Sequence, residues 1–575
     1  MIMKTRFTFL FFITLAVRFA FGQAAVTTPN GTLISNQGGN AAMPASAILE
    51  MRSNNKGMLP PRMTTAQINS IASPAKGLMA YDTEQNCLKA YDGAKWECLG
   101  GTAAAAPSTP LSSSFAYQSI TDNNVYGKDI STDNSGNTIS VGSFRGAVTF
   151  GKNTNSMTLT SMGEYDGYIA KHDPDGNLIW ATQIGGSIND QEILDVDVDN
   201  AGNVAVSGYL KGTTTFYSTN GASSSFTTSN NSYSQIFVAK YNASGVLQWF
   251  KTAGSSGNYH CEGRGVTFDG LGNIYFTGSY RGGVAFAGPT LNSISATDDI
   301  FIAKLNSSGN YVWVKTAGGT SNTEAGFRLV CDNSNNVYLY GYYSGTANFG
   351  ENASVVSYTS RGEYDQFLAK YDPNGELSWA KTAGGIYQDY LGDITYSSVA
   401  NAIYIAGSYR ATITFGPGLG SNPLASVTSS TGIYNGFLAK YDLNGNIQWS
   451  VRNGNTNSDH NYANGVSCDN SGNPYITGGM QYDSYFYSYN SATNYYVRGV
   501  QYREPYIAKY NTSGALSWVI IAPDGYDEGM AGISVKNNTA YVLGNFKETI
   551  NFGYQQIHST NNGYNGNLFI WRYTE

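Results

Sequence analysis

Acidic and histidine side chains recur in this sequence at one place, shortly after a repeated tryptophan. His260 and His460 each stand eleven residues after such a tryptophan, at Trp249 and Trp449. Asp or Glu occupies the corresponding loop in the other copies of the repeat. Where such loops meet, carboxylates and imidazoles can hydrogen-bond a polyhydroxyl ligand, and oxygen donors suit Ca²⁺. The candidate ligand-binding residues are Asp122, Asp190, His260, Glu262, Glu324, Asp389, Asp459, His460, Asp527 and Glu528.

These residues have two alternative roles. Asp and Asn often cap sharp turns, which would make the series structural. Alternatively, Asp389, Asp459 and His460 would act as general acid and base on a carbohydrate. The two histidines lie in copies that are not neighbours, so their spacing does not indicate a zinc site. The acidic run DVDVDNAG at 195–202 lacks the sixth-position glycine of a helix-loop-helix calcium site. Ca²⁺ is therefore the one candidate cofactor, and no metal ligand is assigned.

Signatures of established catalytic sites are missing from the sequence. It contains no H-E-x-x-H, no G-x-S-x-G, no P-loop and no paired C-x-x-C. The formal charge is −7, from 33 basic and 40 acidic residues, and no basic run offers an electrostatic footprint for a nucleic-acid backbone. No catalytic residue is predicted, nucleic acid is not an expected partner, and a non-enzymatic role is favoured.

The elements that must position these loops repeat along the chain. In six copies a Lys is followed nine residues later by Trp, as in FLAKYDPNGELSWAKTAGG at 367–385. A Gly followed eight residues later by Phe occurs seven times, from Gly142 and Phe150 to Gly544 and Phe552. Each copy has alternating apolar residues typical of four short strands, without helical periodicity. This pattern predicts an all-β fold, a seven-bladed β-propeller with four-stranded blades.

Turn residues support the strand assignment. Asp or Asn stands two residues after each repeated Lys and Gly follows three residues later, as in Asp372 and Gly375. Such an Asp accepts hydrogen bonds from its own turn, and Gly takes the positive φ that a turn with a bulge requires. The other hairpin of the repeat has the same Asp and Gly spacing, as in Asp469 and Gly472, and its fourth copy has Asn335 in place of the glycine. The repeated Lys could form a ring of cations, but we expect its stem to pack between blades with its ammonium near a turn carboxylate.

The last copy of the repeat stops after its third strand, and the strand that it lacks has a counterpart at the other end. Residues 115–118, FAYQ, align with the fourth-strand segment WATQ at 180–183. We therefore expect residues 115–120 to pair with 568–573 and to close the ring, which removes an exposed sheet edge.

Two stretches resemble known families. The segment DNSGNPYITG at 469–478, with the Lys and Trp pattern above, resembles the bacterial seven-bladed β-propeller repeat family over about 115–575. That resemblance implies an exported scaffold and transfers no catalytic residue. The segments KGMLPPRMTTAQ at 56–67 and GLMAYDTEQNCLKAYDGAKW at 77–96 resemble an N-terminal module of secreted bacterial surface proteins and fibre-like appendages. This second resemblance implies a stalk or adaptor.

The N-terminal region has the features of a secretory signal. Lys4 and Arg6 precede an apolar run at 7–17, and small residues follow at Ala20 and Gly22. No later stretch approaches the ~20 apolar residues of a membrane-spanning helix. The predicted parts are a signal peptide at 1–22, an adaptor or stalk-like module at 23–101, a linker at 102–114 and the propeller at 115–575.

Five cysteines are present in a chain expected to be exported. Two short alternating runs, at 78–81 and 88–96, predict a hairpin. Cys87 and Cys98 flank it and could form a disulfide or remain apart. Cys331 and Cys468 occupy equivalent strand positions in two repeats, where we expect them to act as buried small hydrophobic residues. A short helix starting near 63–68 is also expected, with Thr64 or Thr65 as its cap.

We expect an exported or cell-surface, non-enzymatic binding scaffold, whose loop face meets a glycan or protein partner. The alternatives are a carbohydrate-active lyase or hydrolase and a purely architectural protein of a matrix or appendage. The N-terminal module would attach or space the propeller and could support an oligomer.

Overall fold

The described part of the chain is almost entirely β-strand, with one short helix. The computed structural model describes residues 24–28, 31–35, 49–52, 60–84, 87–91, 93, 95–98, 115–121, 124–151, 155–187, 190–255, 257–286, 288–294, 297–320, 323–351, 354–416, 423–425, 432–454, 460–490, 494–499, 503–522, 526–547, 549–552, 555–558 and 566–575. The chain divides into two units, Met1–Ala105 and Ala106–Glu575. The predicted signal peptide and linker lie outside the described residues.

The described residues of the first unit form two small sheets. One sheet has the order β1 (Ala24–Thr28), β2 (Gly31–Ser35), β3 (Leu49–Arg52). The other has the order β4 (Arg62–Met63), β5 (Met79–Asp82), β6 (Cys87–Tyr91), β7 (Trp96–Cys98). The expected hairpin at β5 and β6 is confirmed by their antiparallel pairing. The side chains of Cys87 and Cys98 lie outside the described residues, so their disulfide stays a prediction.

The helix α1 (Thr65–Asn69) of the first unit begins as the sequence predicts. The Thr64 hydroxyl accepts a hydrogen bond from the Gln67 N–H at 3.2 Å, and the Gln67 side chain accepts one from the Thr64 N–H at 2.8 Å. This capping box satisfies two backbone donors that the first turn leaves without partners. Next to the helix, Lys89 and Asp82 form a buried ion pair at 2.9 Å.

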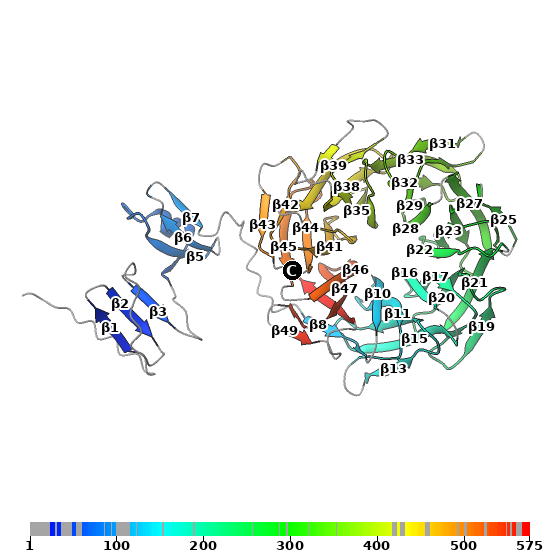
Figure 1. The fold of residues 1–575 in the computed structure, drawn as a ribbon, viewed down its shortest axis with the longest axis horizontal. Helices are drawn as coiled ribbons and strands as arrows, with labels where there is room; N and C mark the ends of the chain where they lie inside the picture. The colour runs from blue at the N-terminus through cyan, green and yellow to red at the C-terminus, as the bar shows by residue number, and fades with distance from the viewer. Residues whose placement is uncertain are drawn as a thin grey trace, which may run out of the picture. The chain divides into compact units, whose positions relative to one another are not determined.

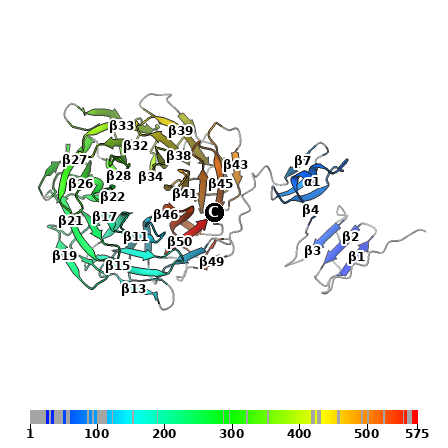
Figure 2. The same cartoon turned by 180° about the vertical axis from the view of Figure 1, so that it is seen from behind.

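The second unit is a β-propeller, in which strands are stacked from the centre outward (Figures 1 and 2). Seven described sheets contain the same order of four antiparallel strands. The innermost strands are β10 (Val125–Thr132), β16 (Glu192–Val198), β22 (Glu262–Phe268), β28 (Ala325–Cys331), β34 (Tyr390–Ser397), β40 (Gly465–Cys468) and β46 (Tyr526–Lys536). The second strands are β11 (Thr138–Phe144), β17 (Val204–Leu210), β23 (Ile274–Tyr280), β29 (Val337–Tyr343), β35 (Ala402–Arg410), β41 (Pro474–Met480) and β47 (Thr539–Lys547).

The two outer positions of each sheet hold the repeated Lys and Trp pattern. The third strands are β14 (Asp166–His172), β20 (Gln235–Tyr241), β26 (Asp299–Leu305), β32 (Asp365–Tyr371), β38 (Tyr434–Asp442), β44 (Glu504–Tyr510) and β50 (Asn567–Thr574). The fourth strands are β15 (Leu178–Gly186), β21 (Leu247–Ser255), β27 (Tyr311–Gly319), β33 (Leu377–Gly384), β39 (Ile447–Gly454), β45 (Leu516–Ile521) and β8 (Phe115–Gln118).

The fourth position of the last sheet is taken by the N-terminal strand β8. It runs antiparallel to β50, with Phe115 opposite Arg572 and Gln118 opposite Phe569. Each innermost strand contacts the next along the chain, and β46 contacts β10. The chain therefore returns to the strand with which the repeats begin.

Each repeat also contains a two-stranded hairpin that the sequence prediction of four strands missed. In five sheets, the hairpin of the following repeat pairs with the fourth strand and so extends the sheet outward. The first hairpin pairs instead with β9 (Ile120–Thr121), through its strand β12. The repeated Phe lies in or beside the first strand of this hairpin. The hairpins are β12 (Ala147–Phe150) and β13 (Met157–Thr160), β18 (Thr213–Tyr217) and β19 (Ser223–Thr227), β24 (Gly283–Ala285) and β25 (Thr290–Asn292), β30 (Thr346–Phe349) and β31 (Val356–Thr359), β36 (Thr412–Phe415) and β37 (Pro423–Ala425), β42 (Ser484–Tyr487) and β43 (Asn494–Val497), and β48 (Thr549–Phe552) and β49 (Gln555–His558).

Neighbouring sheets bury their apolar faces against one another. One cluster joins Val141 and Trp180 of the first repeat with Val206 and Phe237 of the second, and comparable clusters recur around the propeller. Burial of such side chains contributes about 1.5–3 kcal/mol each. The core is thus distributed between sheets, so each repeat depends on its neighbours.

The repeated Lys and Trp also act between or within sheets as structural residues. The Lys171 ammonium lies 2.9 Å from the Asp133 carboxylate, and Lys509 lies 3.1 Å from Asp469, which confirms the expected turn partner. The indole N–H of each described repeat Trp donates to the next repeat, as Trp379 does to the Leu443 carbonyl at 3.2 Å.

The turns have the predicted chemistry. Asp372 Oδ1 accepts hydrogen bonds from the N–H groups of Asn374 and Glu376, both at 2.9 Å. Gly375 has φ +86° and the substituted Asn335 has φ +61°, so both occupy the left-handed region that the turn requires.

Candidate functional site

Six of the seven described innermost strands have a β-bulge near their first residues, where they approach the centre of the propeller. The pairing register shifts between Gly127 and Asp129, and again between Gly326 and Arg328. Equivalent shifts occur in β16, β22, β34 and β46. A bulge inserts an extra residue and re-aims its side chain. The inserted residues differ from repeat to repeat, and they define what a ligand would meet at the centre.

A central cavity of about 320 Å³ is lined by these bulges. It draws residues from all seven repeats, so it marks the mouth of the propeller channel. The lining residues are Gly127, Lys128, Leu194, Arg264, Phe327, Arg328, Leu391, Gly392, Asn464, Met530 and Ala531.

Arg328 anchors the floor of the central cavity. Its Nε lies 3.4 Å from Asp195 and 3.9 Å from Asp393, and its Nη1 donates to the Arg264 carbonyl at 2.8 Å. Burial raises the pKa of Asp393 to about 7, against the opposing effect of Arg328. The guanidinium therefore joins inner strands of three separate repeats, and its charge is already matched by protein carboxylates.

Two further cavities adjoin the central one on the same side. The second, of about 340 Å³, is lined by Thr323, Phe327, Tyr342, Tyr364, Gln388, Asp389, Tyr390 and Leu391. The third, of about 360 Å³, is lined by Tyr390, Leu391, Ser408, Tyr462, Ala463, Asn464, Gly479, Arg503, Gly529 and Met530. Because Leu391 borders all three, we treat them as one surface, the channel-mouth depression.

Aromatic rings and arginines dominate this depression. Tyr342 and Tyr364 meet edge to face with centroids 6.0 Å apart, and Tyr390 lies 4.8 Å from Tyr434. The Arg503 guanidinium lies 4.7 Å from the centre of the Tyr462 ring. Flat apolar faces beside hydrogen-bonding groups are the usual composition of a small-molecule pocket.

Glu324 and Asp389, two predicted site residues, lie beneath the crossover loops. Glu324 is 1% exposed and accepts a hydrogen bond from the Gly319 N–H at 2.8 Å. Asp389 is 3% exposed and accepts one from the Gly385 N–H at 3.0 Å. Both carboxylates cap their crossover turns, as the structural alternative proposed. Asp389 also lines the second cavity.

The environment of these two carboxyl groups disfavours their charged forms. Burial, and then the nearby Asp299, raise the pKa of Glu324 to about 8. Burial, and then Asp365, raise the pKa of Asp389 well above its usual range. A carboxyl group so placed is a poor ligand for a cation at neutral pH.

His260 and His460 occupy equivalent positions in their repeats. Nδ1 of His260 accepts a hydrogen bond from the Ser234 N–H at 3.2 Å, and Nδ1 of His460 accepts one from the Tyr434 N–H at 3.2 Å. His460 also lies against Tyr434 and Tyr462, with centroids 5.3 and 5.9 Å away. Each imidazole thus fixes its loop to the start of a third strand.

The remaining predicted site residues do not gather into one group. Glu262 forms an ion pair with Arg264 at 2.6 Å, and Asp190 is partly buried ahead of β16. Asp122 and Asp459 lie outside the described residues, as do the side chains of Asp527 and Glu528.

The described residues do not form a metal site. Within the described residues, no three His, Cys, Asp or Glu side chains are grouped so as to hold a metal ion. Asp195 and Asp197 instead accept hydrogen bonds from the Val266 and Phe268 N–H groups of the next repeat, at 2.6 and 2.8 Å. The acidic run therefore links adjacent innermost strands.

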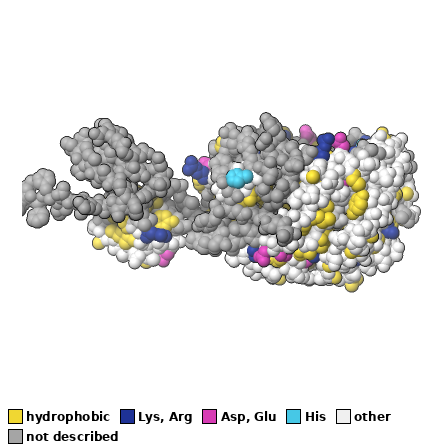
Figure 3. Space-filling view, turned by 90° about the horizontal axis from the view of Figure 1, so that it is seen from below, with side chains coloured by type: hydrophobic (Ala, Val, Ile, Leu, Met, Phe, Trp, Pro, Cys, Tyr) yellow, Lys and Arg dark blue, Asp and Glu magenta, His cyan; other side chains and the backbone are white. Residues whose placement is uncertain are grey.

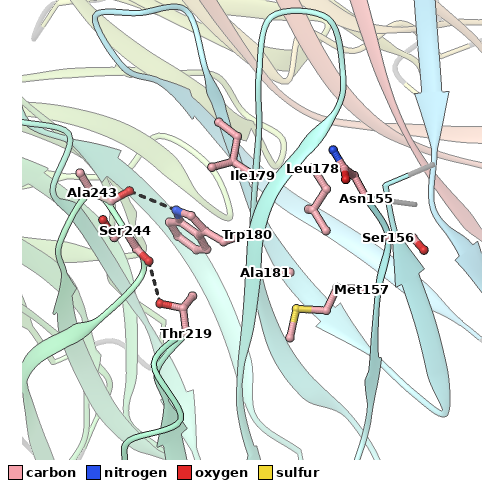
Figure 4. A pocket seen from close by; sticks show the side chains of 10 residues that line it. All are labelled: Asn155, Ser156, Met157, Leu178, Ile179, Trp180, Ala181, Thr219, Ala243 and Ser244. Carbon is pink, nitrogen blue, oxygen red and sulfur yellow. Dashed lines mark hydrogen bonds between the residues drawn. The ribbon is translucent and has the colours of Figure 1, made fainter. Parts of the chain in front are cut away.

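A larger cavity, of about 690 Å³, lies away from the channel (Figure 4). Leu178, Trp180 and Met157 line it together with the turn at Ala243 and Ser244. The Trp180 indole donates to the Ala243 carbonyl at 3.1 Å and is 8% exposed, so its ring is not an open stacking surface. Viewed from the side, the wall of the propeller is mostly neutral surface with bands of hydrophobic side chains (Figure 3).

The aromatic and arginine residues of the depression were not among the predicted site residues. Tyr342 follows a repeated Gly, whereas Tyr364 and Arg503 precede a third strand. These positions vary between repeats, and that variation was the available sequence signal. Nothing in the sequence identified the bulge residues Phe327 and Arg264 as site residues, because the direction of their side chains depends on the register of the strand pairing.

Comparison with known proteins matches two parts of the chain. Residues 38–114 match the family described as phage tail like trimerisation region. An uncharacterised WD repeat-containing protein of Acanthamoeba polyphaga mimivirus is 25% identical over 393 residues, which cover 60% of this chain and 28% of that protein. The match thus spans less than a third of the relative's length.

Solved structures give distant similarities. A catalytically inactive virginiamycin B lyase of Staphylococcus aureus, solved with quinupristin, aligns with a TM-score of 0.33 and 8% identity, covering 80% of this chain and 99% of that chain. The quinohemoprotein alcohol dehydrogenase of Comamonas testosteroni aligns with a TM-score of 0.34 and 10% identity, covering 80% and 77%. Scores this low carry no argument about activity. No described helix is long and apolar enough to cross a membrane.

Proposed function

We propose that this chain is an exported or cell-surface binding protein that uses the channel-mouth depression to hold a saccharide without turning it over. In the proposed architecture the seven sheets are seven blades, and β8 closes the ring. The N-terminal module assembles three chains, so that three propellers engage a repetitive ligand together.

The composition of the depression carries this proposal. Phe327, Tyr342, Tyr364, Tyr390 and Tyr462 place ring faces or edges along adjoining cavities. Sugars present apolar C–H faces together with hydroxyl groups, which match aromatic rings beside hydrogen-bonding side chains. Among the described lining residues Asp389 is the one carboxylate, and its Oδ2 accepts a hydrogen bond from the loop backbone. The described lining therefore favours binding over acid and base catalysis.

The match of residues 38–114 to a trimerisation region supports the oligomeric part of the proposal. Linking three weak sites raises the effective local ligand concentration, which strengthens overall binding without any new contact. The small-residue and proline composition of 102–114 suits a linker that lets each propeller orient independently.

A glycan array probed with the full-length chain tests the proposed function. We expect binding by the wild type and loss of at least tenfold in affinity for the double variant Tyr390→Ala/Tyr462→Ala, which removes two ring faces. Ile179→Ser is the matched control, because Ile179 is 49% exposed beside the outer cavity. Unchanged binding by a double variant with a native circular dichroism spectrum would place the ligand elsewhere.

Product analysis of the bound glycans distinguishes the alternative of a carbohydrate-active enzyme. Retention of an intact ligand agrees with a binding protein, whereas new reducing ends or unsaturated products would establish a hydrolase or lyase. Light scattering on the full-length chain tests assembly, for which we expect the mass of three chains.

A further inference from the structure

Arg503 is the basic residue among the described residues that line the third cavity, and within the described residues its charge has no carboxylate partner. Arg264 pairs with Glu262 at 2.6 Å, and Arg281 pairs with Asp298 at 2.7 Å. Within the described residues, the Arg503 guanidinium has no carboxylate partner, and its Nε is buried without a hydrogen-bond acceptor. An N–H group that is buried without an acceptor is costly, and a ligand that supplies an acceptor would remove this cost.

The protein holds Arg503 in place before any ligand arrives. Its guanidinium lies 4.7 Å from the centre of the Tyr462 ring, and its stem crosses Gly479. A Cβ at position 479 would lie 2.5 Å from Cγ of Arg503, so only glycine leaves room for the stem. The other repeats have a side chain at the equivalent position, namely Ser143, Tyr209, Ser279, Tyr342, Ser408 and Asn545.

A stack of rings extends behind Arg503 and supports its orientation. Tyr462 stacks on Tyr434 with centroids 5.8 Å apart and an interplanar angle of 27°. Arg410 lies over the other part of this stack, 4.6 Å from the Tyr434 ring centre. Two guanidinium groups thus flank two stacked rings, which fixes the plane of each guanidinium against an aromatic face.

The described lining of the cavity in front of Arg503 carries no carboxylate. Of the described residues that line the third cavity, none is Asp or Glu. Glu504, the next residue along the chain, is fully buried in β44 and does not line this cavity. Ser408 and Asn464 supply neutral polar groups, and the volume of about 360 Å³ suits one or two sugar rings.

We infer that the third cavity is a carboxylate-recognition subsite, in which Arg503 binds the acid group of a uronic-type sugar whose ring lies against Tyr462 and Tyr390. This inference rests on the proposed function and names its substrate class, a carboxylated saccharide. Arg presents its N–H groups in a planar fork that matches a carboxylate in two parallel hydrogen bonds, which explains the need for a fixed guanidinium plane.

A matched pair of ligands tests the inference by calorimetry on the full-length chain. The probes are an oligomer of galacturonic acid and the same oligomer after reduction of its carboxyl groups to neutral galactose. We expect the wild type to bind the acidic oligomer at least about tenfold more tightly, a preference of ~1.4 kcal/mol that weakens as salt rises. Equal affinity for the two oligomers would overturn the inference.

Variants then assign the preference to Arg503. Arg503→Gln should bind both oligomers equally, and Gly479→Ala should reduce the preference by displacing the Arg503 stem. Arg281→Gln is the control, because Arg281 already has a carboxylate partner and should leave the preference intact. An acid preference that survives in Arg503→Gln would overturn the assignment.

The outcomes separate this inference from the proposed function. Neutral binding without acid preference refutes the carboxylate subsite and leaves the saccharide-binding function standing. Failure of every array glycan to bind refutes both. A sulfated oligomer of equal length is a third probe, and tighter binding of that probe than of the carboxylated one would overturn the choice of a carboxylate.

Discussion

The turn end and the channel-mouth end of each sheet are built from the same strands, yet their polar groups behave differently. At the turn end, Asp372 is bonded to its own turn and Trp379 donates to the next repeat. At the mouth end, the Nε atoms of Arg410 and Arg503 are buried without a described acceptor. The repeated residues thus make the contacts that hold the propeller together, whereas residues that vary between repeats include groups without a described partner.

The largest expected effect comes from deleting residues 112–121, which removes β8 and β9. The fourth strand of the last sheet would be lost and β50 would become an exposed edge, so we expect a loss of more than ~5 kcal/mol in the free energy of unfolding. Thermal melting followed by circular dichroism measures the loss. A melting curve equal to that of the wild type would show that the repeats do not need β8.

Replacing a repeated tryptophan should lower the free energy of unfolding and leave the affinity for the ligand unchanged. Trp449 is 5% exposed and donates to the Thr512 carbonyl at 3.1 Å. We expect Trp449→Ala to cost about 3–5 kcal/mol through a cavity, and Trp449→Phe to cost about 1 kcal/mol through the lost hydrogen bond. Denaturant unfolding gives both values. Reduced glycan affinity in a folded Trp449→Phe protein would contradict the division between the two ends.

Two arginines of the depression offer a direct comparison of a matched and an unmatched charge. Arg328→Leu leaves Asp195 and Asp393 buried without their cation, and we expect a loss of roughly 3 kcal/mol. Arg503→Leu removes a guanidinium whose Nε is buried without a described acceptor, so the unfolding free energy should stay the same or rise. Urea unfolding of both variants tests this, and equal losses would refute the distinction.

The last prediction concerns pH. Burial and then Asp299 raise the pKa of Glu324 to about 8, so its protonated form is favoured in the folded state. The stability that Glu324 contributes is fully present below the pKa that its carboxyl group has in the unfolded chain. This stability is lost as pH rises through about 8, the pKa in the folded state. We therefore expect the melting temperature to fall between pH 5 and 9.

The variant Glu324→Gln should have a flatter curve and be about 1–3 kcal/mol more stable than the wild type at pH 9. The glutamine keeps an oxygen that can accept the Gly319 N–H. Glu363→Gln, at an exposed position, is the control and should retain the wild-type slope. Parallel pH curves for Glu324→Gln and wild type would show that Glu324 is not the group responsible.

Much of the fold could be predicted because its determinants are local. Gly375 and its preceding Asp372 define a turn from a few adjacent residues, and apolar alternation defines the strands. The pairing of β8 with β50 followed from one aligned segment, FAYQ. The extra hairpins escaped prediction because their strands are short and pair with the previous repeat.

The site was harder to predict because it depends on the direction of each side chain and on the partners with which its polar groups bond. Asp389 and Glu324 looked like ligands, but each accepts a backbone hydrogen bond beneath its loop. Phe327 faces the centre only because a bulge shifts the register of β28. The unmatched charge of Arg503 depends on which carboxylates lie nearby, and one sequence does not contain that information.

The hairpins that extend each sheet also bear on synthesis of the chain. In the sheet that begins with β22, the outermost strands β30 and β31 belong to the following repeat. A ribosome that has completed one repeat has therefore not yet completed one sheet, whose outer edge waits for residues still to be translated. The N-terminal β8 waits longest, because its partner β50 is made last. Strand edges therefore stay open through much of elongation, and such edges expose a nascent chain to aggregation.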